Sequence, residues 1–287
     1  MAEWVQLENG CICCSVKNDT VQALESLVGQ RDRFDYVIIE TGLANPGPVA
    51  AALWTDKELE AAACLDAIVT VVDAKNILRH LGNKAEAAQQ IAFADRVLIN
   101  KCDLVSPEEL AEVEEAIRSI NSQVDILQCT RCHVDLGKLL NTGLYTGNGN
   151  DNDISPLNAQ ACGDHDSCEH SVHHHKHEHD IRTVTIIESS PLDLKRLRHW
   201  LDELLWEDDN KKAHPNPPEI FRIKGYLNVE SEDTAYILQA VHEIYEVREG
   251  PVWSSDSTRT SKFVFIGRHL DSLALSSGIQ QCCRANV

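Results

Sequence analysis

The eight residues Arg96-Val97-Leu98-Ile99-Asn100-Lys101-Cys102-Asp103 give the clearest indication of how this chain folds. They begin with a short apolar run and end in polar and charged side chains. A continuous apolar run of this length is typical of a strand that a parallel sheet buries on both faces. In such sheets, ligands bind beyond the carboxyl ends of the strands. The stretch therefore predicts a buried strand and, at residues 100–103, a candidate binding site.

Three further apolar runs flank this strand, at residues 34–40, 67–73 and 125–128. The first two end in the acids Glu40 and Asp73, which would lie at the same edge of the sheet. Segments with helical periodicity separate the runs. Apolar strands that alternate with helices predict an α/β fold, in which a parallel sheet is covered by helices on both faces.

We place this α/β domain at residues 1–142 and expect three of its helices from the pattern. The first follows Asn18 or Asp19, either of which can cap a helix. A second runs through Trp54, and a third covers residues 107–119.

A polar segment at residues 143–180 separates this domain from the rest of the chain. Of the 13 histidines in the chain, seven fall between residues 165 and 179, with Cys162 and Cys168 close by. A segment of this composition cannot bury a core, and its imidazoles and thiolates favour weak, labile metal binding. The candidate ligands in the densest part of the segment are His173, His174, His175, His177 and His179. The alternative is a solvated linker without a ligand.

Regular patterns return at residue 181. We expect a strand at 183–187, a helix at 191–206, and strands at 220–229, 235–249 and 262–267. The strand at 235–249 is expected to be bent. A helix packed on one face of such strands predicts a small α+β domain at 181–271. Residues 272–287 are short of apolar periodicity, and we assign them no element.

Three thiols are crowded into the stretch Gly10-Cys11-Ile12-Cys13-Cys14. Thiolate sulfur binds Zn²⁺ and Cu⁺ well, and coordination deprotonates the thiols near neutral pH. Cys11, Cys13 and Cys14 are therefore candidate metal ligands that leave one tetrahedral position open. Reduced core cysteines and a disulfide framework are the alternatives, because free cysteine is among the most buried residue types.

Composition narrows the classes of function and compartment. Lys and Arg total 26 against 45 Asp and Glu, a net charge of −19, which argues against a nucleic-acid surface and favours attraction of cations. No apolar run approaches the ~20 residues that span a bilayer. The first residues carry no basic and apolar regions of a secretory signal, so we expect a reducing, cytoplasmic setting and no membrane contact.

In combination, the motifs resemble those of the CobW family of metal-chaperone GTPases, and among them the eukaryotic zinc-regulated GTPase metalloprotein activators. The resemblance spans residues 3 to about 271. It rests on Asn9-Gly10-Cys11-Ile12-Cys13-Cys14-Ser15, Glu40-Thr41-Gly42-Leu43-Ala44-Asn45-Pro46, Asn100-Lys101-Cys102-Asp103 and a second domain that begins near Arg182. It implies a P-loop NTPase-like sheet followed by a CobW C-terminal domain.

The function that this resemblance implies is GTP-dependent delivery of Zn²⁺ to a client metalloprotein. The cofactors would be Zn²⁺, GTP and Mg²⁺, and a zinc aminopeptidase is one candidate client. No nucleic-acid partner is expected.

The resemblance also assigns roles to individual residues. The Asp103 carboxylate can accept two hydrogen bonds from the edge of guanine, which adenine cannot supply, with Asn100 and Lys101 supporting the loop and the base. Glu40 matches the acidic position beside the Mg²⁺ water shell, and Gly42 the glycine that faces the γ-phosphate. The alternatives are a chance Asn-Lys-x-Asp match and a surface acid at position 40. Asp73 is as readily a helix cap as a functional group.

Three departures from the family pattern affect the expected activity. The sequence Gly-x-x-x-x-Gly-Lys-Ser/Thr is absent, since the only Gly-Lys pair, Gly137-Lys138, is followed by Leu139. Glu40-Thr41-Gly42 is one residue shorter than the family's Glu-x-x-Gly, and the last ~15 residues do not resemble the family's terminal helix. We therefore expect a domain truncated at its start, with impaired GTP turnover.

Two other functional classes remain. A non-catalytic zinc-binding or adaptor protein is favoured by the missing phosphate loop. A thiol oxidoreductase is less favoured, because no thioredoxin-like pattern surrounds the cysteines. Cys129-Thr130-Arg131-Cys132 is expected to form a loop near the guanine pocket, with a second metal site as the lesser alternative.

Overall fold

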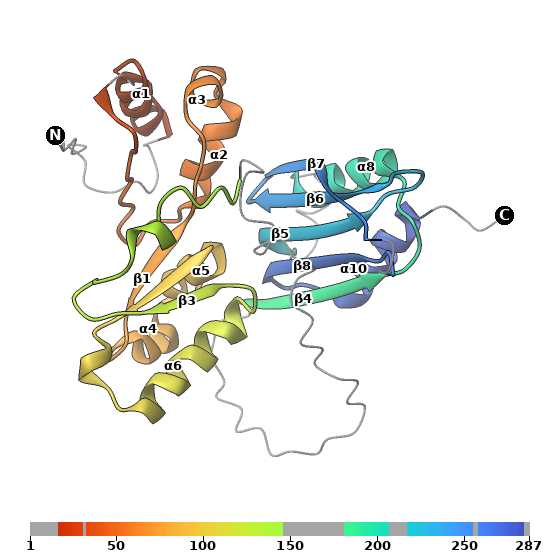
Figure 1. Ribbon diagram of the computed structural model, residues 1–287. Helices are drawn as coiled ribbons and strands as arrows, with labels where there is room; N and C mark the ends of the chain where they lie inside the picture. The colour runs from red at the N-terminus through yellow and green to blue at the C-terminus, as the bar shows by residue number, and fades with distance from the viewer. Residues whose placement is uncertain (1–16, 31–32, 146–180, 207–216, 255–257, 284–287) are drawn as a thin grey trace, which may run out of the picture.

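The computed structural model describes residues 17–30, 33–145, 181–206, 217–254 and 258–283 (Figure 1). Two sheets organise them. The first is parallel, in the order β1-β2-β3, and the second is antiparallel, in the order β4-β8-β5-β6-β7. The strands are β1 (Val69–Asp73), β2 (Arg96–Asn100), β3 (Asp125–Gln128), β4 (Ile181–Glu188), β5 (Glu219–Asn228), β6 (Thr234–Val241), β7 (Ile244–Val252) and β8 (Ser261–Arg268).

The helices are α1 (Lys17–Val28), α2 (Gly47–Thr55), α3 (Lys57–Ala62), α4 (Ile77–Asn83), α5 (Ala85–Phe93), α6 (Pro107–Ile120), α8 (Leu194–Leu205) and α10 (Ser272–Cys282), with short 3₁₀ turns η2 (Cys102–Leu104) and η3 (Leu136–Lys138). Helices α4, α5 and α6 pack beside the parallel sheet, and α8 and α10 pack on one face of the antiparallel sheet (Figure 1). No helix in the described ranges is long and apolar enough to cross a membrane.

The expected strand at the centre of the parallel sheet is confirmed. β2 is buried from Arg96 to Ile99 and pairs in parallel with β1 on one side and β3 on the other. The helix predicted at 107–119 is α6, which starts with a capping box between Ser106 and Glu109 and buries Val113 and Ile117. These elements fold as predicted because period, length and capping residues agree.

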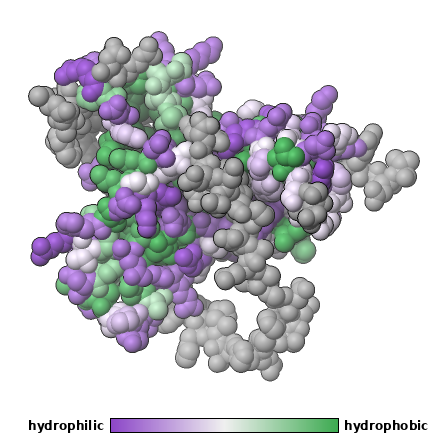
Figure 2. Space-filling model, viewed as in Figure 1, coloured by the Kyte–Doolittle hydropathy of each residue, from purple (hydrophilic) through white to green (hydrophobic). Residues whose placement is uncertain are grey.

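The prediction that helices cover both faces of the sheet is wrong for β1 among the described residues. Thr70 and Val72 are buried, and the Thr70 hydroxyl donates to the Gln90 carbonyl of α5. Val69 and Val71 point to the opposite face and are exposed. Figure 2 shows more extensive apolar surface over the half of the molecule that holds the parallel sheet.

The apolar run at 34–40 forms no strand in the described part of the chain. It pairs with no neighbour there, and Ile38 is 85% exposed. A strand requires a ladder partner, and β1 offers its hydrogen bonds only to β2 within the described residues. The first helix also differs from the prediction, because α1 begins at Lys17, so Asn18 and Asp19 lie inside the helix instead of capping it.

The second half of the chain follows the predicted order with two corrections. The expected bent strand at 235–249 is a hairpin, β6 and β7, which turns at His242 and Glu243. His242 has a positive φ of 58°, a conformation for which Gly, Asn or Asp is the usual sequence signal. The sequence gives no such signal, which explains the missed turn.

The second correction concerns the end of the chain, for which no helix was expected. α10 starts at an N-cap, Asp271, whose carboxylate accepts hydrogen bonds from the backbone of Leu273 and Ala274. Its small residue Gly278 lies directly against Trp200 of α8, where a Cβ would approach the indole nitrogen to 2.2 Å. The buried positions Leu275, Gly278, Ile279 and Cys282 follow helical spacing, but a glycine and a cysteine among them weaken the apolar signal in the sequence.

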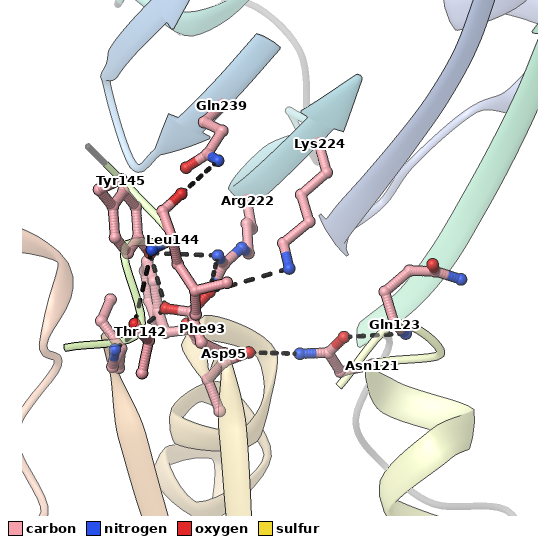
Figure 3. Close-up of polar contacts among 12 residues, drawn as sticks. Phe93, Asp95, Asn121, Gln123, Thr142, Leu144, Tyr145, Arg222, Lys224 and Gln239 are labelled. Atoms are coloured by element: carbon pink, nitrogen blue, oxygen red, sulfur yellow. Dashed lines mark hydrogen bonds and ion pairs between the residues drawn. The ribbon is translucent and has the colours of Figure 1, made fainter. Parts of the chain in front are cut away.

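A buried polar cluster joins the two sheets (Figure 3). Arg222 of β5 donates to Asp95, which immediately precedes β2, and its other nitrogen donates to the Phe93 carbonyl at 2.8 Å. Asp95 also accepts from the Tyr145 hydroxyl at 2.8 Å and from the Ile68 amide at 3.0 Å. The partners come from β5, from the segments that immediately precede β1 and β2, and from the chain after η3.

Charge in this cluster is well compensated. Burial alone would raise the pKa of Asp95, but the cations Arg222 and Lys224 outweigh burial and lower it. Burial raises the pKa of Tyr145 well above its ordinary value, so its hydroxyl stays protonated and donates. Apolar contact between Phe93 and Phe221, whose ring centroids are 5.3 Å apart, adjoins the cluster. We therefore expect the two sheets to form one packed unit.

Candidate functional site

Two strand ends meet beside each other at the carboxyl edge of the parallel sheet. Asp73 of β1 lies opposite Asn100 of β2 in the strand register. The backbone of Ala74 donates to the Asn100 carbonyl at 2.9 Å, which continues the ladder past the end of the strand. The predicted proximity of Asp73 to the 100–103 stretch is therefore confirmed.

Lys101 is fixed by an ion pair across these two ends. Its Nζ lies 2.7 Å from Asp73 Oδ2, and its backbone adopts the left-handed conformation with φ 64°. The hydrogen bond from Lys101 lowers the pKa of Asp73, partial burial opposes the shift, and Asn76 adds to the lowering. Asp73 stays ionised near neutral pH and holds the lysine stem beside the edge of the sheet.

Asp73 has a second role, in the turn that leads to α4. Its Oδ1 accepts from the Lys75 amide at 2.9 Å, and its Oδ2 accepts from Asn76 Nδ2 at 3.0 Å. Asp73 therefore orders the turn before α4 and pairs with Lys101, but it is not the cap of α4, because Asn76 holds the N-cap position.

Asn100 connects β2 to the loop that follows β3. Its Oδ1 accepts a hydrogen bond from the Cys132 amide at 3.0 Å, and its Nδ2 donates to Cys132 Sγ at 3.0 Å. The Cys129 thiol also approaches Oδ1, at 3.7 Å. The loop is a tight turn, closed by the His133 amide on the Thr130 carbonyl. The expectation that the Cys129–Cys132 loop lies beside the 100–103 stretch is confirmed.

Asp103 completes this edge of the sheet. It lies in η2, two residues beyond Lys101, and is exposed. The turn follows β2 directly, so Asp103 lies at the same edge of the sheet as Asn100 and Lys101. A planar base could therefore meet a carboxylate, an ordered loop and a fixed lysine stem together.

Glu40 and Gly42 lie in a separate loop before α2. Glu40 is exposed, and Gly42 has a positive φ of 58°, which a side chain would strain. Gln90 of α5 anchors this loop by donating to the carbonyls of Gly42, at 2.5 Å, and Ala44, at 3.2 Å. Sequence reasoning missed Gln90, since a lone glutamine on a helix carries no signal for a loop contact.

The predicted metal ligands fall outside the described residues. These are Cys11, Cys13 and Cys14, and His173, His174, His175, His177 and His179. Within the described ranges, no group of three or more His, Cys, Asp or Glu side chains is arranged to hold a metal ion.

The fold is an α/β domain with a parallel sheet, followed by a domain with an antiparallel sheet. Residues 1–128 match the CobW/HypB/UreG nucleotide-binding domain, and residues 181–283 match the cobalamin synthesis protein CobW C-terminal domain. The chain belongs to the CobW family of metal-chaperone GTPases.

Curated relatives align with most of the chain. The chain is 34% identical to "Zinc-regulated GTPase metalloprotein activator 1" of Schizosaccharomyces pombe, over 95% of this chain and 70% of the relative. It is 28% identical to "Zinc chaperone YjiA" of Escherichia coli, over 92% and 77% of the two chains. The crystal structure of Zn(II)-bound YjiA GTPase superposes with a TM-score of 0.70, covering 97% of this chain and 81% of that one at 24% identity. That likeness shows the P-loop NTPase-like fold with its CobW C-terminal domain.

Proposed function

We propose that this chain is a GTP-dependent zinc metallochaperone that delivers Zn²⁺ to a client metalloenzyme in the cytoplasm, with nucleotide turnover impaired. The observation that carries the proposal is the arrangement of Asn100, Lys101 and Asp103 at the end of β2, next to Asp73. The names of the relatives, which are zinc-regulated activators and zinc chaperones, support the metal part.

Guanine would bind at the edge formed by residues 100–103. Asp103 accepts the two donors of the guanine edge, and Asn100 holds the Cys132 loop in place to form one side of the site. The Lys101 stem, held by Asp73 at 2.7 Å, forms another side. A carboxylate that meets the adenine edge in place of the guanine edge would lose both hydrogen bonds, so the site favours guanine over adenine.

Zn²⁺ is the cargo in this proposal, and Cys11, Cys13 and Cys14 are its ligands. Three thiolates suit zinc and leave a fourth position through which the ion can be exchanged. The five histidines at 173–179 would bind zinc more weakly and act as a local reserve. The client is a metalloprotein, for which a zinc aminopeptidase is one candidate.

Turnover is impaired because the sequence contains no phosphate loop. Backbone amides, a lysine and a hydroxyl of that loop supply most of the phosphate binding and the Mg²⁺ ligand in NTPases of this class. Glu40 and Gly42 are the proposed contacts to the Mg²⁺ water shell and the γ-phosphate, and Gln90 holds their loop. The missing loop also favours a second candidate, a zinc-binding adaptor without nucleotide turnover.

Cys13→Ser should remove the tightly bound zinc. A serine hydroxyl is a poor ligand for zinc beside thiolates, so we expect the site to lose at least tenfold in affinity. Zinc stoichiometry is measured after dialysis against a chelator that strips the histidine segment. Cys64→Ser is the matched control, because Cys64 is an exposed free thiol that is not one of the predicted ligands. Unchanged stoichiometry in Cys13→Ser would contradict the assignment.

A further inference from the structure

Two thiols share a single side-chain amide at the base-binding edge. Cys132 Sγ accepts from Asn100 Nδ2 at 3.0 Å, and the Cys129 thiol approaches Asn100 Oδ1 at 3.7 Å. The two sulfurs are therefore held close together across one carboxamide group. Neither thiol belongs to the proposed zinc ligands, and the proposed guanine site uses the backbone of the Cys132 loop but neither thiol.

The geometry of the loop favours contact between the two thiols. Arg131 and Cys132 both have positive φ, 53° and 55°, and the turn is closed by the His133 amide on the Thr130 carbonyl at 3.1 Å. A turn with two left-handed residues folds back tightly and is strained when neither residue is glycine or asparagine. Cys129 directly precedes this turn and Cys132 is its third residue, and the sulfurs of both contact the Asn100 carboxamide.

We propose that a small-molecule disulfide such as glutathione disulfide reversibly oxidises Cys129 and Cys132 to a disulfide. This disulfide weakens the binding of a guanine nucleotide beside the loop of residues 129–132. The effect on nucleotide binding rests on the proposed guanine site, whereas formation of the disulfide does not.

The two thiols have different roles in the exchange. Cys132 is exposed, so its thiolate attacks a sulfur of glutathione disulfide, and one glutathione thiolate leaves. Cys129 is buried, and burial, together with the sulfurs of Cys132 and Cys102, raises the pKa of its thiol. It therefore reacts second, losing its proton to water and attacking the Cys132 sulfur, which expels the second glutathione. Two thiols are oxidised, and one glutathione disulfide is reduced to two thiols.

Formation of the disulfide changes the hydrogen bonds that the Asn100 side chain can make. A disulfide bond would place the two sulfurs about 2.05 Å apart. In the reduced form, the Cys132 sulfur contacts Nδ2 of the Asn100 carboxamide and the Cys129 sulfur contacts Oδ1. Disulfide formation also removes the thiol proton that Cys129 directs at Oδ1. A single hydrogen bond contributes about 1 kcal/mol, so we expect roughly fivefold weaker binding of a guanine nucleotide in the oxidised form.

The disulfide is tested by peptide mapping of the full chain. Protein is equilibrated with graded ratios of glutathione and its disulfide, alkylated and digested with trypsin. Cleavage after Arg131 places Cys129 on the peptide 119–131 and Cys132 on 132–138, while Cys102 falls on 102–118. We expect a cross-link between 119–131 and 132–138, reversed by dithiothreitol, and a glutathione adduct on Cys132 in Cys129→Ser. The exposed Cys64 is the internal control for reagent access.

Two mapping results would overturn the proposal that Cys129 and Cys132 form a disulfide. One is alkylation of both thiols at ratios that glutathionylate Cys64, and the other is a cross-link from Cys129 to the peptide that holds Cys102. Binding of a fluorescent GTP analogue is then compared between the reduced and cross-linked forms. Equal, measurable affinity would refute the effect on the loop. If neither form binds the analogue while the cross-link forms, the proposed guanine site fails and the disulfide stands.

Discussion

Arg222→Met should lower the free energy of unfolding by about 3–5 kcal/mol, because removing one partner leaves a buried charge without compensation. Asp95 is 1% exposed and would keep only Lys224, at 3.8 Å, as a cationic partner. The Phe93 carbonyl would also lose the donor that now lies at 2.8 Å. Methionine fills much of the volume of the arginine stem, so the loss reports charge and hydrogen bonding more than packing.

Arg259→Met is the matched control for this prediction. Arg259 pairs with Asp233 at 3.3 Å, but Asp233 is 92% exposed, and such surface pairs contribute about 0–1 kcal/mol. The double variant Asp95→Asn with Arg222→Met removes both charges and should recover part of the loss. Urea-unfolding midpoints measure all three. Equal effects of Arg222→Met and Arg259→Met would show that the buried cluster does not hold the sheets together.

Gly267→Ala should destabilise the antiparallel sheet by about 1–3 kcal/mol through overpacking. A Cβ at this position would lie 2.1 Å from the Glu219 carbonyl oxygen, a backbone atom that cannot rotate away. The strand register between β5 and β8 shifts between Ile220 and Arg222, directly opposite this glycine. The close contact between Gly267 and Glu219 therefore lies at the register shift. The same shift places Arg222 in the buried polar cluster with Asp95.

Gly82→Ala is the control with the opposite expected sign. Gly82 lies in α4, and a Cβ there would meet nothing within 4 Å. Alanine in place of an unstrained helical glycine stabilises a protein by about 0.4–1 kcal/mol. Thermal unfolding midpoints compare the two variants. A neutral Gly267→Ala would mean that β5 and β8 can separate at this point without consequence for the fold.

Local signals in the sequence predicted the elements in which several levels of pattern agree. The β2 stretch combines an apolar run with a polar end, and the α6 stretch combines periodicity with a cap. The approach of Asp73 to Lys101 and of the Cys129–Cys132 loop to Asn100 followed from the rule that carboxyl ends of parallel strands share one edge.

Features that depend on tertiary contact could not be predicted in the same way. The run at 34–40 has strand-like composition, but composition does not supply a ladder partner. The pairing of Asp95 with Arg222 joins residues far apart in sequence, and each residue alone is an ordinary charged side chain beside an apolar run. The turn at His242 and the close packing at Gly278 arise from the surrounding structure and not from residue preference.

The central claim is that residues at the end of β2 bind guanine. It is tested by isothermal titration of the purified chain with GTP and with ATP, in the presence of Mg²⁺ and with or without one equivalent of Zn²⁺. We expect GTP to bind weakly but at least tenfold more tightly than ATP, and we expect Asp103→Asn to abolish this binding. Zinc should be retained, and hydrolysis should stay close to the uncatalysed rate. Equal affinity for GTP and ATP, or binding that Asp103→Asn leaves unchanged, would contradict a guanine site at the end of β2.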